Sequence, residues 1–174
     1  MVSYLYASPS GVPGDVTRVD DSNVEPIMLA SPYPANYGLP MKYAASGIGG
    51  AESVTPMAAT DAAAVFCGIL VRAVPAISGS STNESFDTFE PNPAEPQGLL
   101  VRGYASVYVQ AGSPVRGQTV YVVQTASAGH LAGQFEVGSN GGNNVALTGT
   151  VVGNVTWAAD GVDSNGFGEV RVAQ

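Results

Sequence analysis

Residues 99–110 (LLVRGYASVYVQ) are rich in the β-branched and aromatic side chains that favour strands. Similar short runs follow at 115–124 (VRGQTVYVVQ), 133–137 (GQFEV), 145–148 (VALT), 154–158 (NVTWA) and 169–172 (EVRV). Separators such as 139–144 (SNGGNN) supply the glycine and asparagine that tight turns need. Because no amphipathic helical stretch of useful length interrupts the series, the pattern predicts a mainly β fold, a compact β-barrel or sandwich.

The β fold is expected to begin near residues 65–71 (VFCGILV), a short apolar run that suits a strand buried on both faces. Periodicity alone leaves a helix open here, and residues 58–64 could extend the run as a helical turn. Alternate side chains of a half-buried strand face opposite sides, so one set points into the core. The core candidates are Phe66, Ile69, Val107, Val109, Val120, Val122, Phe135 and Trp157.

The N-terminal part of the chain is built differently, because all prolines except Pro114 lie within residues 1–96. Proline fixes φ and removes a backbone donor, so residues 1–40 are expected to run extended as an arm. The arm carries aromatic side chains that it can bury, those of Tyr4, Tyr6, Tyr33 and Tyr37. Two alternatives stay open: a solvated, disordered N-terminus, and an arm that packs back on its own β body.

A long surface loop is expected at 78–97 (SGSSTNESFDTFEPNPAEPQ), which is polar in its first half and rich in proline in its second. The sequence therefore predicts an extended N-terminal arm at 1–40 and a β body at 41–174. The loop at 78–97 projects from that body.

Composition excludes several classes of partner. The 174 residues suffice for one domain with a real core, and only 11% of them are charged. With 14 acidic against 6 basic residues, the net charge is −8, which does not suit binding to nucleic acid. The longest apolar run, 62–71, is far shorter than the roughly 20 residues that a membrane span needs. The start of the chain does not resemble a signal peptide, so synthesis in a reducing cytoplasm is expected.

Residues for catalysis or metal binding are scarce. The chain has one cysteine, Cys67, and one histidine, His130, which excludes a disulfide within one chain and a zinc site of the usual kind. His130 lies between two predicted strands and is expected to be an exposed turn residue. The sequence contains no phosphate-binding loop and no nucleophile-elbow motif. It therefore predicts no catalytic, cofactor-binding or metal-binding residues, and no cofactor.

Residues 160–166 (DGVDSNG) resemble a calcium-binding loop at first sight. Aligning Gly166 with the invariant glycine of such loops puts Gly161 at the first ligand position, so the motif fails. A tight, glycine-rich hairpin explains these residues with fewer assumptions. The alternative is a weak cation site formed by Asp160, Asp163 and Glu169.

A set of stretches carries a family resemblance through its order and spacing. These stretches are 33–38 (YPANYG), 65–72 (VFCGILVR), 98–107 (GLLVRGYASV), 116–122 (RGQTVYV), 133–137 (GQFEV), and Trp157 through Glu169 and Val170. Together they resemble the structural cement proteins of tailed bacteriophage capsids, also called decoration proteins, over about residues 30–172. The loop at 78–97 is longer than this family tends to have.

The resemblance implies a non-enzymatic protein that binds the outside of the expanded head, bridges neighbouring major capsid subunits and stabilises the shell. It implies a place on the outer surface of the virion, after synthesis in the host cytoplasm. A homo-oligomer is expected, with a trimer at local three-fold positions preferred over a dimer. Neither nucleic acid nor a membrane is expected as a partner.

The arm is expected to supply much of the grip on the capsid, because aromatic side chains dominate binding hot spots. The expected capsid contacts are Tyr4, Tyr6, Arg18, Tyr33 and Tyr37. Arg18 is the only basic residue before Lys42 and is expected to pair with an acidic capsid group. Two other classes remain open. One is a minor tail or baseplate β-module, and the other is a carbohydrate-binding or hydrolase module on the virion surface.

Overall fold

The computed structural model describes residues 12–44, 52–72, 90–127 and 129–173. Within these ranges the backbone is mainly β, with two short 3₁₀ helices. In chain order the elements are η1 (Val19–Asp21), β1 (Asn23–Leu29), β2 (Pro40–Tyr43), β3 (Ser53–Pro56), η2 (Ala63–Val65), β4 (Phe66–Val71), β5 (Gln97–Ala111), β6 (Val120–Val123), β7 (Phe135–Val137), β8 (Asn144–Ala146), β9 (Asn154–Trp157) and β10 (Phe167–Ala173).

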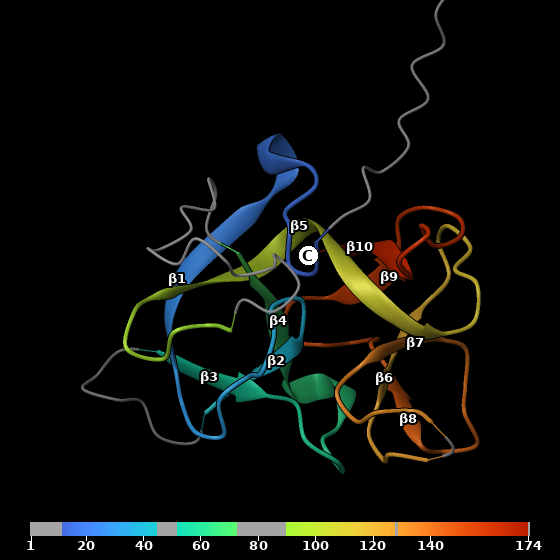
Figure 1. Cartoon of the computed structure of the whole chain (residues 1–174), viewed down its shortest axis with the longest axis horizontal. Coiled ribbons are helices and arrows are strands. Elements are labelled where there is room, and N and C mark those ends of the chain that lie inside the picture. The colour runs from blue at the N-terminus through green and yellow to red at the C-terminus, as the bar shows by residue number, and fades with distance from the viewer. Residues whose placement is uncertain (1–11, 45–51, 73–89, 128, 174) are drawn as a thin grey trace, which may run out of the picture.

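The strands β1 to β5 form a closed barrel. β1 pairs with β3, β3 with β2, β2 with β4 and β4 with β5, and β5 returns to pair with β1. The β1–β3 pair is parallel and the other pairs are antiparallel. In Figure 1 this barrel occupies the left side of the molecule. The prediction of a mainly β fold with a compact barrel body is confirmed.

The longest strand, β5, belongs to two regions of the molecule. Residues 97–102 pair with β1 and β4 in the barrel, whereas residues 103–108 pair with β10. The change of partner occurs at Gly103, whose φ of 123° is a conformation that L side chains rarely adopt. A Cβ atom at this position would lie 2.2 Å from the Oγ of Ser22. Gly103 therefore allows β5 to turn from one region into the other.

The second half of β5 and the strands β6 to β10 form what we call the C-terminal part. β10 pairs with β9, and β6 lies between β7 and β8. A β-bridge between Thr119 and Thr156 joins these two groups, and the backbone N–H of Trp157 donates to the carbonyl of Gln118. Figure 1 shows this part on the right of the molecule, with β5 crossing from the barrel into it.

The core follows the expected pattern. All residues of β4 are buried, as a strand covered on both faces requires. Buried and exposed positions alternate along much of β5. Each predicted core residue is buried, with at most 6% of its surface exposed: Phe66, Ile69, Val107, Val109, Val120, Val122, Phe135 and Trp157.

The structure adds strands that the sequence analysis missed. The prediction places the first strand near Val65, whereas β1, β2 and β3 come earlier in the chain. The prolines of this segment argue for an irregular arm, but they do not prevent strands. Pro40 begins β2 and Pro56 ends β3, positions where a strand tolerates a missing N–H. The sequence leaves a helical turn open for residues 58–64, and a 3₁₀ turn, η2 at Ala63–Val65, directly precedes β4.

Parts of the expected arm and loop can be compared with the structure. Residues 12–40 lie on the β body, since they contain β1 and pair with β5 both there and at Val16. Residues 1–11 lie outside the described residues. So do residues 73–89, which include most of the loop expected at 78–97. The loop's last residue, Gln97, begins β5.

Candidate functional site

The described N-terminal segment runs along the middle of β5. Val16 forms a β-bridge with Ala105. On one side of this bridge, the N–H of Gly14 donates to the carbonyl of Ser106, and the N–H of Ser106 donates to the carbonyl of Asp15. On the other side, the N–H of Thr17 donates to the carbonyl of Tyr104. Backbone hydrogen bonds of this kind hold the segment in a fixed register. Residues 12–17 are therefore part of the folded body.

Arg18 is held by residues of its own chain. Its guanidinium forms an ion pair of 2.8 Å with Glu169, whose side chain is only 6% exposed, and Thr17 donates a hydrogen bond to the same carboxylate. The guanidinium also lies 4.1 Å from the ring centroid of Tyr104. The hydrogen bond to Glu169 raises the pKa of Arg18 above its ordinary value. The side chain remains 43% exposed, so it is both engaged within the chain and accessible from outside.

The four tyrosines of the expected arm are in different situations. Tyr4 and Tyr6 lie outside the described residues. Tyr33 is 53% exposed. Tyr37 is buried, donates its hydroxyl hydrogen to the side chain of Gln97 at 2.7 Å, and lies beneath the guanidinium of Arg72. Burial raises the pKa of Tyr37 above its ordinary value. Tyr33 is therefore a surface residue, and Tyr37 is a packing residue.

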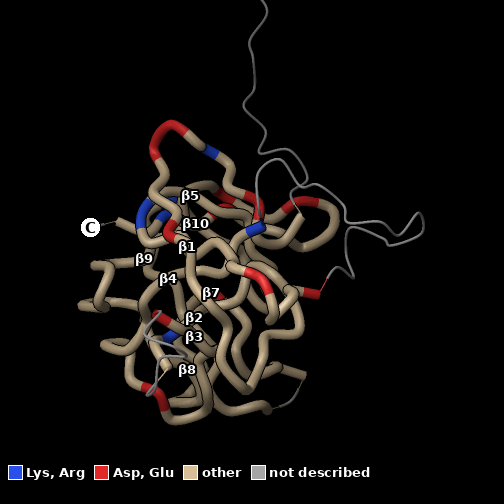
Figure 2. Tube along the Cα trace, turned by 90° about the vertical axis from the view of Figure 1, so that its left-hand side faces the viewer, with Lys and Arg blue, Asp and Glu red and all other residues tan. Residues whose placement is uncertain are grey.

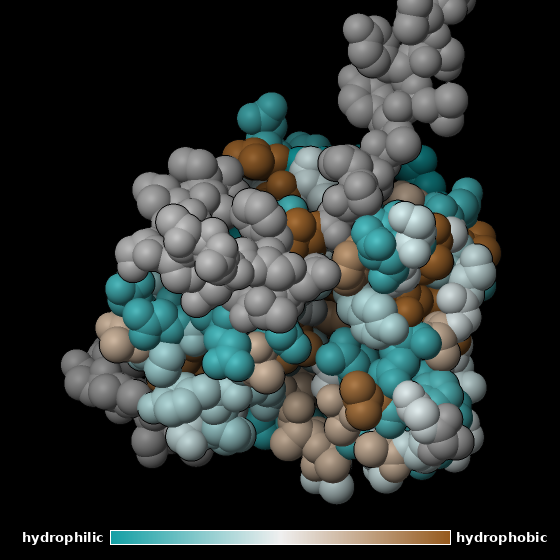
Figure 3. All heavy atoms as spheres, in the orientation of Figure 1, coloured by the Kyte–Doolittle hydropathy of each residue, from teal (hydrophilic) through white to brown (hydrophobic). Residues whose placement is uncertain are grey.

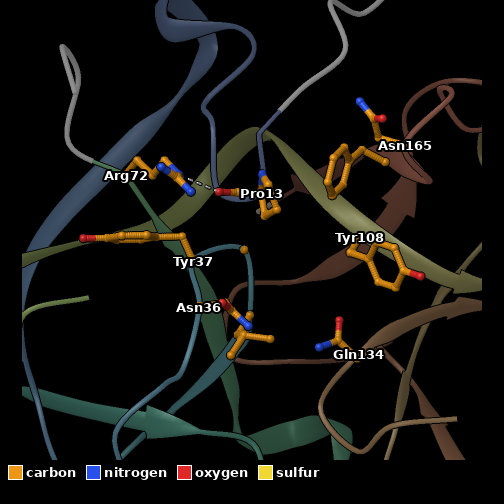
Figure 4. Close-up of a pocket in the computed structure, with 10 residues that line it drawn as sticks. Pro13, Asn36, Tyr37, Arg72, Tyr108, Gln134 and Asn165 are labelled. Carbon is orange, nitrogen blue, oxygen red and sulfur yellow. Dashed lines mark hydrogen bonds between the residues drawn. The ribbon is translucent and has the colours of Figure 1, made fainter. Parts of the chain in front are cut away.

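A pocket of about 360 Å³ lies where the barrel meets the C-terminal part. It is lined by Pro13, Asn36, Tyr37, Gly38, Leu39, Arg72, Tyr108, Gln134, Asn165 and Phe167. Figure 4 shows Pro13, Asn36, Tyr108 and Gln134 around the same space, and Arg72 donating to the carbonyl of Pro13. The lining contains no carboxylate. It therefore lacks the acid–base pair that glycoside hydrolysis uses.

Sequence reasoning missed this pocket. Its residues come from the segment before β1, the loop before β2, the residue after β4, the C-terminal half of β5, and the residues at or near the starts of β7 and β10. No local motif links these segments. Only their strand pairing brings them together, and that pairing is a long-range property of the fold.

His130 is not the exposed turn residue that was predicted. It does lie in a turn, but its Nδ1 is 2.8 Å from the carboxylate of Glu136, which is only 2% exposed. The amide of Asn144 donates to the other oxygen of that carboxylate. A buried carboxylate is costly without hydrogen-bond partners, and the inward position of the imidazole supplies one. The His130–Glu136 pair is thus a structural link between a loop and β7.

The acidic residues near the C-terminus do not converge. Asp160 accepts a hydrogen bond from the backbone of Arg116, while Asp163 accepts from the N–H groups of Asn165 and Phe167 in its own turn. Glu169 is engaged by Arg18. Within the described ranges, no group of three or more Cys, His, Asp or Glu side chains could hold a metal ion.

Two further features bear on function. Cys67 is fully buried, and this burial raises its thiol pKa to about 12, so the thiol is not poised as a nucleophile. Within the described residues, no helix has the length and apolarity needed to cross a membrane. On the face shown in Figure 3, apolar residues form small groups scattered among polar ones.

Comparisons with known proteins point to a phage capsid. The model of the family described as XM1 gp53 minor capsid protein matches residues 1–170. A chain from a solved structure entitled "The capsid of Myoviridae Phage XM1" is similar, with a TM-score of 0.65 and 20% sequence identity. That match covers 100% of this chain and 98% of the other, and at this identity it shows the fold alone. No curated protein matches this sequence at a significant level.

Proposed function

The chain belongs to the XM1 gp53 minor capsid protein family, and from this premise we propose that it is a decoration protein of the phage head. It binds the outer surface of the expanded head, bridges neighbouring major capsid subunits and stabilises the shell. The observation that carries the proposal is the family match over residues 1–170. The broader statement, that the chain is a capsid-associated structural protein of a phage, follows from the family itself.

The surface and core of the molecule support this role. Only 11% of the residues are charged, and Figure 2 shows long stretches of the chain without a charged residue. A surface with few charges loses little solvation energy when it is covered by a partner. The closed barrel also gives the chain a rigid body, so little conformational entropy is lost on docking. The proposal assigns no catalytic activity to the chain.

Stabilisation of the shell would work through binding equilibria. A protein that binds the expanded lattice, and not the separate subunits, stabilises the lattice by mass action. We propose that the chain acts as a homo-oligomer, a trimer at local three-fold positions in preference to a dimer. Once one protomer is docked, its partners are held beside their own sites at a high effective concentration. Modest contacts per protomer then suffice.

The proposed contacts lie at the N-terminal end of the chain. Tyr4, Tyr6 and the exposed Tyr33 are the proposed aromatic anchors. Arg18 is a weaker choice, because its charge is already paired with Glu169. Tyr37 supports the loop before β2 from within, so it acts on the contact surface only indirectly.

A binding experiment with expanded heads that lack this protein tests the proposal. The structure sets the deletion at residues 1–11, since Gly14 and Val16 already pair with β5. This deletion and Tyr33→Ala should each lower the affinity for heads, measured by co-sedimentation, about tenfold or more, while melting temperatures stay unchanged. Tyr43→Ala, which alters an exposed tyrosine of β2, is the matched control and should bind normally.

Two results would contradict the proposal. One is undiminished head binding by both the deletion and Tyr33→Ala. The other is a reconstruction of the virion that places the protein in the tail or baseplate at low copy number, as a minor tail module would be. A reconstruction of decorated heads also counts the subunits at each site, and this count decides between trimer and dimer.

A further inference from the structure

The pocket between the barrel and the C-terminal part is not needed for the proposed capsid role. Its volume of about 360 Å³ lies within the range of small-molecule sites. Its walls come from both regions of the molecule, with Asn36 on the barrel side and Tyr108 and Gln134 on the other. A site built across such a junction keeps its shape only when both regions are folded.

Side-chain amides supply most of the hydrogen-bonding groups of the lining. The side-chain amides of Asn36, Gln134 and Asn165 make no hydrogen bond to another described residue. By contrast, the side-chain amides of Asn144 and Gln97 donate to backbone carbonyls. Each primary amide offers two donors and one carbonyl acceptor. In Figure 4 Asn36 and Gln134 lie at the bottom of the space, and Asn165 lies at its upper rim. This set suits a ligand that both donates and accepts hydrogen bonds.

Aromatic side chains form the other part of the wall. Tyr108 is 42% exposed. Its ring lies 6.0 Å from that of Phe167 at an interplanar angle of 71°, an edge-to-face contact that orients it. An oriented and partly exposed ring offers a flat apolar surface with a hydroxyl at its tip. The C–H face of a sugar ring is complementary to such a surface.

The charge of the lining favours a neutral ligand. Arg72 is the only charged residue in the lining; it is buried, donates to the carbonyl of Pro13 and lies over Tyr37. Its positive charge is therefore occupied within the protein. A peptide backbone is a poorer match, because β5 at Tyr108 is already paired with Phe167 of β10 and offers that side to no added strand.

We propose that this pocket binds a neutral saccharide, with Tyr108 stacking on a sugar ring and with Asn36 and Gln134 bonding to its hydroxyls. The inference goes beyond capsid binding and does not depend on it. On the outside of a head, such a site would hold the particle to glycans of a cell surface.

The test uses the full chain and saturation-transfer NMR with neutral trisaccharides of glucose, galactose, mannose or N-acetylglucosamine. At about 10 mM sugar, at least one of these probes should show transfer, as expected for a weak, single-site ligand. Tyr108→Ala and Gln134→Ala should each weaken the affinity for that sugar, measured by titration of the transfer signal, about tenfold or more. Tyr43→Ala and Asn23→Ala remove an exposed tyrosine and an exposed asparagine outside the lining, and both should bind like the wild type.

The same variants separate this inference from the capsid role. Gln134→Ala should keep its melting temperature, whereas Tyr108→Ala should melt slightly lower because it loses the contact with Phe167. Both variants should stay folded and keep their binding to expanded heads. The saccharide site is refuted if none of the probes shows transfer to the wild type, or if the pocket variants bind as well as the controls. Selective binding of a proline-rich peptide at Tyr108, in place of every sugar, would also overturn it.

Discussion

The barrel and the C-terminal part share β5 but are held together by different means. In the barrel, every strand is paired on both sides and β4 is buried along its whole length. Both buried carboxylates of the described residues, Glu136 and Glu169, lie in the C-terminal part. Each of them binds side chains from other segments, His130 and Arg18 among them. Backbone pairing and apolar burial thus close the barrel, whereas polar side-chain links help to fix the short strands and loops of the C-terminal part.

The largest expected effect concerns the apolar centre of the C-terminal part. Trp157 is almost fully buried, and its ring packs against Gly168 of β10. Trp157→Ala should lower the free energy of unfolding by about 3 to 5 kcal/mol, because it removes a large buried ring and leaves a cavity. Urea denaturation measures this loss. Trp157→Phe should lose clearly less, since it keeps an aromatic ring and removes an N–H that has no acceptor among the described residues.

Next in size is a change at the junction of the two regions. Gly103→Ala adds a Cβ at a φ of 123° and places it 2.2 Å from the Oγ of Ser22. Backbone strain and overpacking together should cost about 2 to 4 kcal/mol in unfolding free energy. Gly117→Ala is the control, since Gly117 also has a positive φ but a Cβ there meets nothing within 4 Å. If both variants were equally stable, β5 would not depend on the close approach at Gly103.

The sequence predicts the C-terminal part and the core well because local chemistry determines them. Strand-forming runs such as that at Val120 alternate with glycine turns. Large apolar side chains such as Phe135 are stable only when they are buried in the core. The strands β1, β2 and β3 of the barrel cannot be predicted from such local patterns. Pro26 lies inside β1, opposite Gly98, and only the long-range pairing of β1 with β5 makes the segment a strand.

The candidate site was harder to predict for the same reason. The sequence suggests Tyr37 as a capsid contact in a proline-rich segment, yet the side chain of Gln97, sixty positions later, accepts a hydrogen bond from its hydroxyl in the interior. His130 reads as an exposed turn residue until the fold brings the buried Glu136 beside it. Partners that lie far away in the sequence, or that are fixed by strand register, decide the state of both residues. A single sequence does not contain those contacts in readable form.

A smaller effect is expected where a polar link is removed from the C-terminal part. His130→Ala leaves the buried carboxylate of Glu136 with Asn144 but without the imidazole. The loss should be about 1 to 2 kcal/mol, because water can reach a site whose histidine is partly exposed and can replace part of the bond. Chemical denaturation measures it, and the double variant His130→Ala, Glu136→Gln should recover part of the loss. Equal stability of wild type and His130→Ala would remove this pair from the comparison.

The smallest expected effect is a difference of zero between two probes of unfolding. The barrel contains the only cysteine, Cys67, and the C-terminal part contains the only tryptophan, Trp157, so each region carries its own reporter. In the native protein Cys67 is buried with a thiol pKa of about 12, so it should resist a thiol reagent at about pH 8, where exposed thiols react.

As denaturant is added, Cys67 labelling and Trp157 fluorescence should change at the same midpoint. The reason is that β5 pairs with β4 in the barrel and with β10 in the C-terminal part. Unfolding of either region therefore removes strand partners from β5 and destabilises the other region. Labelling of Cys67 well before the fluorescence change would show instead that the barrel opens alone, and β5 would then be a hinge between two separate folding units.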